Sequence, residues 1–223
     1  KKVKKDVDPI RDLEIIETEI ILSDLESLQK RLEKSNKKKL EKDELDFLEE
    51  CKKLINDGKK TDELKKKYSK NLIKKSALLS LKPRIIVCNV GEKNLPDGNE
   101  YSDDCKKKFP DENIIIVCAD IEDQIMSLET KDRKDFMFES GIKSTGLDNL
   151  IKTGYSALGL STFFTSGPEE SRAWTIEKNS KAADAAGVIH TDFKKKFIRA
   201  ETVTSEDFIK YKGFNECKNV GKL

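Results

Sequence analysis

The sequence offers little that would mark a secreted, membrane-bound or metal-binding protein. No signal peptide is recognisable, and no apolar run approaches the roughly 20 residues of a membrane span. The cysteines stand far apart and form no C-x-x-C pair, so no zinc motif or disulfide framework is indicated. They are Cys51, Cys88, Cys105, Cys118 and Cys217. We therefore expect a cytoplasmic protein with reduced thiols, in which Cys88 and Cys118 are buried within apolar runs.

Apolar residues are also scarce, at 36% of 223 residues, whereas charged residues make up 39%. Such a surplus of charge requires extensive solvated surface, which long helices provide. The net charge is only +2, but residues 30–82 hold 18 Lys/Arg and 10 Asp/Glu, a net of +8. A basic segment of this kind fits either a polyanionic partner or a solvated helical face, and composition leaves both open.

Apolar residues at helical spacing predict a helical hairpin in the first third of the chain. Helices are expected over residues 10–34 and 43–56, separated by a polar break at 35–42. The apolar stripe is narrow, as in two helices packed mainly on each other, which indicates an antiparallel coiled-coil hairpin. A third helix over residues 61–75 should follow it.

A different pattern begins at Pro83. The runs Pro83–Asn89 and Ile114–Ala119 are apolar and β-branched and do not alternate, which predicts strands of a parallel sheet buried on both faces. A helix near 102–108 would be the crossover of a right-handed β–α–β unit. Further helices are expected at 121–128, 131–140 and 147–158.

After Gly159, short strands mixed with helix predict a small α+β domain. His190, the only histidine, has no second metal ligand or nucleophile near it in sequence, which favours a hydrogen-bonded structural role. Strands are expected at 160–165, 172–176 and 197–203, with a helix at 181–186 and a turn at 187–192.

Two loops after the predicted strands carry groups suited to a nucleotide base. Ligands of open parallel sheets bind outside the carboxyl ends of the strands, and the Asn89 amide offers an acceptor and donors to a purine. P-loop GTP-binding proteins place N-K-x-D here. With Val90 for Lys and the longer Glu92 for Asp, guanine selectivity should be lost.

The second loop, Cys118-Ala119-Asp120-Ile121-Glu122, follows the next strand and would present a backbone N–H to the base. An N-x-x-E loop by itself is usually only a turn, and the second loop by itself can be a helix cap, but two such loops on successive strands favour a base site more than one does. No G-x-x-x-x-G-K-[ST] loop for phosphates occurs anywhere in the chain.

These segments resemble the YchF-type Obg-like ATPases of the P-loop GTPase superfamily (TRAFAC/Obg class). The resemblance covers nearly the whole chain, from Val7 to Leu223, and includes the N-x-x-E motif that in this family accompanies a preference for ATP. It is carried by Val7–Ile16, Asn89–Glu92, Cys118–Glu122, Thr162–Ile176 and Ala185–Phe193.

The resemblance implies an α/β fold with three parts. Residues 1–82 would be a helical hairpin with flanking helices, inserted into the second half of a P-loop NTPase parallel sheet at 83–159. Residues 160–223 would be an α+β TGS domain of the β-grasp type, incomplete at its C-terminus. The base-binding residues would be Asn89, Val90, Glu92, Cys118 and Ala119.

The family is cytoplasmic, hydrolyses ATP with Mg²⁺ and is linked to the ribosome. The basic hairpin and the TGS domain are the expected surfaces for ribosomal RNA or protein, and no membrane or DNA partner is expected. The family's Walker A loop, switch regions and catalytic histidine precede the part that matches here. We therefore expect no catalytic or metal-binding residue in this chain, no tightly held cofactor and no hydrolysis by the chain alone. The alternative is an RNA- or ribosome-docking module without nucleotide hydrolysis.

Overall fold

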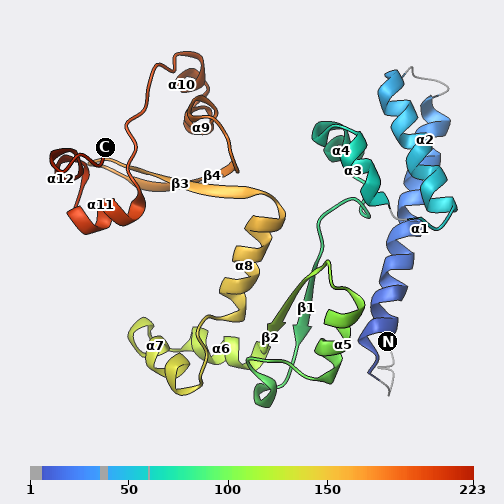
Figure 1. The fold of residues 1–223 in the computed structure, drawn as a ribbon, viewed down its shortest axis with the longest axis horizontal. Coiled ribbons are helices and arrows are strands. Elements are labelled where there is room, and N and C mark those ends of the chain that lie inside the picture. Colours follow the sequence, from blue (N-terminus) through green and yellow to red (C-terminus); the bar gives the residue numbers. More distant parts are fainter. Residues whose placement is uncertain (1–6, 36–39, 60) are drawn as a thin grey trace. The chain divides into compact units, whose positions relative to one another are not determined.

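The computed structural model describes residues 7–35, 40–59 and 61–223 (Figure 1). The chain separates into two compact units, residues 1–154 and 155–223. The boundary lies inside helix α8 (Gly146–Ala157). The three-part division expected from the sequence stays a prediction.

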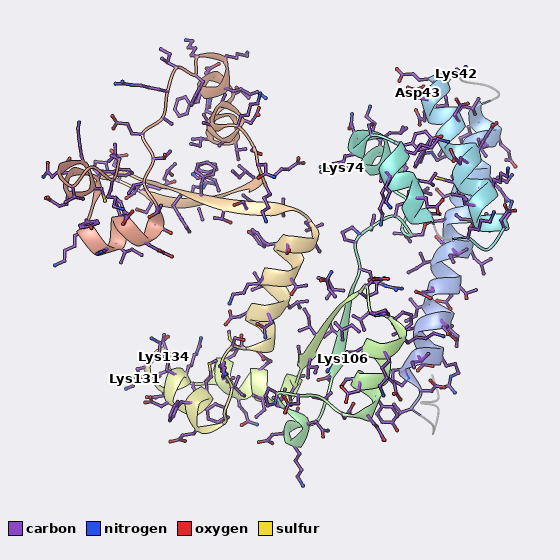
Figure 2. All side chains as sticks on the ribbon, in the orientation of Figure 1. Lys42, Asp43, Lys74, Lys106, Lys131 and Lys134 are labelled. Carbon is purple, nitrogen blue, oxygen red and sulfur yellow. The ribbon has the colours of Figure 1, made fainter. Side chains whose placement is uncertain are left out.

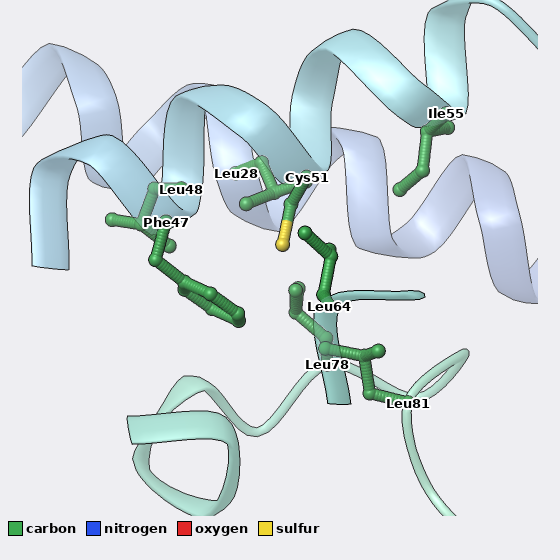
Figure 3. Packing of buried hydrophobic residues seen from close by; sticks show 8 residues of the cluster. All are labelled: Leu28, Phe47, Leu48, Cys51, Ile55, Leu64, Leu78 and Leu81. Atoms are coloured by element: carbon green, nitrogen blue, oxygen red, sulfur yellow. The ribbon is translucent and has the colours of Figure 1, made fainter. Parts of the chain in front are cut away.

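The first unit begins with the predicted helical hairpin. Helix α1 (Pro9–Ser35) and helix α2 (Lys42–Asn56) run antiparallel, side by side (Figure 1). The side chains of Leu28, Phe47 and Cys51 are completely buried between the hairpin and the segment that follows it (Figure 3). The hairpin is therefore confirmed, although half of the polar break, residues 36–39, lies outside the described residues.

The single helix predicted over 61–75 is wrong. The chain forms a 3-10 turn, η1 (Thr61–Glu63), and two short helices, α3 (Leu64–Lys67) and α4 (Lys70–Ser76). The interruption occurs because Ser69 adopts an extended conformation and its hydroxyl accepts a hydrogen bond from the Leu72 N–H at 3.3 Å. Ser69 is thus the N-cap of a new helix.

Two contacts join helix α1 to the chain that enters the sheet. The buried Asp24 carboxylate accepts hydrogen bonds from the Leu79 and Ser80 N–H groups, both at 2.8 Å. The Arg84 guanidinium bridges the carboxylates of Glu17 on α1 and Glu112 just before the second strand. Charged groups placed in this way fix the start of the first strand against α1.

Strands β1 (Ile85–Asn89) and β2 (Asn113–Val117) pair in parallel, with Ile85 opposite Asn113 and Asn89 opposite Val117. Helix α5 (Glu100–Lys108) connects them, so the β–α–β unit is confirmed (Figure 1).

The expected burial of the strands on both faces is wrong, because Val87 is 45% exposed while its neighbour Ile86 is 6% exposed. The sheet has two strands in the described part of the chain. Both are therefore edge strands, and one face is covered less than the other.

The remaining elements of the first unit surround the carboxyl ends of these strands, and the predicted helices begin within two residues of their observed starts. Cys118, Ile121 and Ile125 form a small buried cluster that anchors the helix after β2. The elements are η2 (Glu92–Asn94), α6 (Ala119–Ser127), α7 (Thr130–Glu139) and the first turns of α8.

The second unit contains strands β3 (Leu160–Ser166) and β4 (Ser171–Glu177), which form close to where strands were predicted. They pair antiparallel as a hairpin. The strand predicted at 197–203 is wrong: this segment is irregular, and Ile198 is 91% exposed. The turn predicted at 187–192 is also wrong, because all of these residues except His190 lie in helices. The helices are α9 (Ala182–Ile189), α10 (Thr191–Lys195), α11 (Ser205–Tyr211) and α12 (Phe214–Asn219).

Candidate nucleotide-base site

The two predicted base-binding loops meet at the carboxyl ends of β1 and β2. The Asn89 Oδ1 accepts a hydrogen bond from the Ala119 N–H at 3.1 Å, and the Val90 N–H donates to the Val117 carbonyl at 2.8 Å. Both contacts follow from the strand register, since Asn89 lies directly opposite Val117. Residues 30 positions apart in sequence are therefore joined at one edge of the sheet.

The bond between Asn89 and Ala119 determines what each group can offer to a ligand. The oxygen of the Asn89 amide accepts a hydrogen bond from the protein itself, so the two amide N–H groups are what Asn89 can donate to a ligand. The Ala119 N–H, which the sequence suggested for the base, is held by Asn89 in this structure. Cys118, the N-cap of α6, makes no side-chain cap hydrogen bond.

The five predicted base-binding residues fall into two groups. Asn89, Glu92 and Ala119 are exposed, and Glu92 opens the 3-10 turn η2 just beyond β1. Val90 is 8% exposed and Cys118 is 1% exposed, with Cys118 packed in the cluster that anchors α6. The exposed residues can contact a base directly, whereas Val90 and Cys118 can act only by holding the two loops in place.

Glu122 is a residue of this region to which the sequence assigned no role. Its carboxylate accepts hydrogen bonds from the Gly146 N–H and, at 3.4 Å, from the Leu147 N–H at the start of α8. Negative charge is stabilising at a helix N-terminus, so Glu122 ties α8 to the first turn of α6. The acidic residue was visible in the loop motif, but its partner lies 24 positions away and has no local signal.

Gly146 permits this approach by having no side chain. A Cβ atom built there would lie 2.6 Å from the Val117 Cγ1 and 3.0 Å from the Glu122 Oε1. The contact with Val117 is shorter than real Cβ atoms show, so a larger residue at this position would force Val117 to shift.

His190 lies in the second unit, away from the two loops in sequence, and is the N-cap of α10. Its Nδ1 accepts a hydrogen bond from the Asp192 N–H at 3.2 Å, which is the structural role expected from the sequence. Across the part of the chain that the structure describes, no three His, Cys, Asp or Glu side chains are grouped so as to hold a metal ion. Within the same residues, no helix combines the length and apolarity needed to cross a membrane.

Comparisons with known proteins identify relatives of this chain. A family named YchF-GTPase_C, described as a protein of unknown function (DUF933), matches residues 160–223. The chain is 40% identical over 227 residues to the "Ribosome-binding ATPase YchF" of Bacillus subtilis (strain 168), covering 97% of this chain. It is 39% identical over 225 residues, with the same coverage, to the protein of that name in Escherichia coli O157:H7. The chain belongs to the YchF family.

A solved YchF structure has the same arrangement of helices and small sheets. The Schizosaccharomyces pombe YchF GTPase superposes with a TM-score of 0.80 over 100% of this chain, at 33% identity. This chain spans 62% of the length of the two bacterial YchF proteins and 63% of the yeast one. The names of these relatives refer to different nucleotides: the bacterial proteins are called ATPases and the yeast protein a GTPase.

Proposed function

We propose that this chain is the base-binding and ribosome-docking portion of a ribosome-associated enzyme that hydrolyses ATP in preference to GTP. The observation that carries the proposal is the Asn89–Ala119 hydrogen bond, which assembles a two-loop site at the carboxyl ends of paired parallel strands. The names of the bacterial relatives, ribosome-binding ATPases, support the nucleotide and the partner.

The preference for adenine rests on the residues that replace N-K-x-D. In that motif the Asp accepts two hydrogen bonds from guanine. Here Glu92 is one methylene longer and sits on an exposed 3-10 turn, and the buried Val90 supplies no ammonium group. A site built to hydrogen-bond one base rejects another strongly, because mismatched polar groups are left unpaired. We propose that Asn89 and Glu92 contact the base and that Val90, Cys118 and Ala119 shape its pocket.

In this proposal residues 83–159 are the second half of a P-loop NTPase sheet, residues 1–82 contain its inserted hairpin, and residues 160–223 are a TGS domain. The whole protein would hold ATP with Mg²⁺, and no residue of this chain is assigned to the metal. The chain carries no Walker A sequence, so by itself it should not hydrolyse ATP.

The proposal can be tested with a variant that separates the two roles of Asn89. Asn89→Asp keeps an oxygen that can accept from the Ala119 N–H but removes both N–H donors, whereas Asn89→Ala removes everything. Ligand-observed NMR with adenosine, ATP and guanosine detects weak binding. We expect adenosine and ATP to bind the unchanged chain but neither Asn89 variant. The control is Lys93→Ala, at an exposed neighbouring position, which should bind both ligands as the unchanged chain does.

The same titration separates the two functional classes. If no nucleotide binds but the chain still cosediments with ribosomes, the chain acts as a docking module and the base site has no role. That alternative is favoured by the surplus of lysine in residues 30–82.

A further inference from the structure

The positive charge of residues 30–82 does not lie on the two long helices of the hairpin. Helix α1 carries seven acidic and four basic residues, and α2 carries five acidic and three basic residues. Residues 64–76, which form α3 and α4, carry six lysines and no acidic residue. We call these lysines the lysine patch: Lys65, Lys66, Lys67, Lys70, Lys74 and Lys75.

The lysine patch is displayed on a firmly held support. The apolar side chains of the same segment are turned inward: Leu64 is 1% exposed, and Leu72 and Ile73 pack against the hairpin core. Tyr68 packs edge-on against Phe47, with ring centroids 5.0 Å apart. All six lysines are exposed, and Figure 2 shows Lys74 projecting from this region.

Internal contacts account for only part of this charge. The Lys67 Nζ lies 2.6 Å from the Glu50 carboxylate. Lys66, Lys70 and Lys75 form no ion pair with any residue that the structure describes. Lys70 also occupies the first turn of α4, where the helix dipole disfavours a cation and no acidic residue compensates it. Helix stability therefore does not explain the lysine at this position.

We propose that the lysine patch is the surface through which the chain contacts the phosphate backbone of structured RNA, with α1 and α2 acting as its support. Lysine ammonium groups are compact point charges that bind phosphates without reading bases. A membrane is disfavoured as the partner, because residues 64–76 expose no apolar side chain that could enter a bilayer. The assignment to RNA rests on the proposed association with ribosomes.

The test compares two triple variants of the 223-residue chain that remove equal charge. Lys66→Gln, Lys70→Gln and Lys75→Gln remove lysines of the patch that have no internal ion pair. The control changes Lys107→Gln, Lys131→Gln and Lys134→Gln, exposed lysines on α5 and α7 that lie among acidic residues; Figure 2 labels Lys131 and Lys134. Binding to a fluorescein-labelled RNA duplex is followed by anisotropy over a series of salt concentrations, and ribosome binding by cosedimentation.

We expect the patch variant to bind the duplex at least about tenfold more weakly at low salt. The slope of log affinity against log salt should fall by about 3, one for each phosphate that no longer meets a lysine. The control should match the unchanged chain, and Lys→Arg at the three patch positions should restore binding.

Equal RNA binding by the patch and control variants would overturn the proposal. Loss of ribosome binding with unchanged duplex binding would overturn it as well, because the patch would then face a protein.

These results also separate this inference from the proposed function. If none of the chains cosediments with ribosomes but duplex binding still depends on the patch, ribosome association fails and the RNA surface stands. If ribosome binding is equal in all variants and duplex binding does not depend on the patch, the RNA surface fails and ribosome association stands.

Discussion

The Asn89 side-chain oxygen holds the Ala119 N–H at 3.1 Å, which leaves the two Asn89 N–H donors for a ligand. Sequence reasoning could place both loops at strand ends, because a β-branched run followed by polar residues is a local signal. It could not show that the Ala119 N–H is taken by Asn89 or that Glu122 holds α8. These contacts depend on the register of β1 against β2 and on a partner far along the chain.

A prediction at the scale of single residues concerns Gly146. Gly146→Ala should lower the free energy of unfolding by about 1–3 kcal/mol, because the new Cβ would lie 2.6 Å from the Val117 Cγ1. Gly154→Ala, in the same helix with no atom within 4 Å of its Cβ, should instead raise it by about 0.5–1 kcal/mol through helix propensity. Urea unfolding measures both. Equal effects of the two substitutions would mean that the close approach at Gly146 is not required.

At the scale of elements, the accuracy of prediction depended on how local the signal was. The hairpin and the strands β1 to β4 have periodic or β-branched sequences and form where expected. The segment 197–203 has strand-forming residues but no partner strand in the described chain, and strand propensity is decided by such neighbours. The break at Ser69 depends on a side-chain cap, which competes with helix continuation in a way that periodicity does not show.

The hairpin core leads to a prediction about alkaline pH. Burial, together with the nearby Glu50 and Asp24 charges, raises the pKa of the Cys51 thiol to about 12, from an ordinary value of 9.0. The folded pKa lies above the unfolded one. Below about pH 9 the thiol is neutral in both states and the fold keeps its full stability. Between about pH 9 and 12 the thiol ionises only in the unfolded state, so the free energy of unfolding falls by about 1.4 kcal/mol for each pH unit.

The measurement is urea unfolding of the chain and of Cys51→Ala at several pH values above neutrality. The difference in unfolding free energy between them should shrink steadily above pH 9, because the variant has no thiol to ionise. A difference that stays constant up to pH 11 would contradict the burial of an unpaired thiol in this core.

At the scale of the whole molecule, the first unit carries both the proposed base site and a basic surface. The proposed base site lies at the ends of β1 and β2, and the lysine patch lies on α3 and α4. Charge counts over a sequence window could show that residues 30–82 are basic. They could not show that the charge belongs to α3 and α4 rather than to the long helices, because that required the observed helix boundaries.

In the proposed function, the N-x-x-E loop binds a base and turns the site away from guanine. Its most direct test is the ratio of adenosine to guanosine affinity, measured by ligand-observed NMR, in the chain and in Glu92→Asp. Glu92 is exposed, so the substitution should leave the fold intact. We predict that the unchanged chain prefers adenosine and that Glu92→Asp shifts the ratio toward guanosine by about tenfold or more, the usual effect of a well-placed bidentate contact. A preference for guanosine in the unchanged chain, or a ratio that Glu92→Asp does not change, would contradict the account.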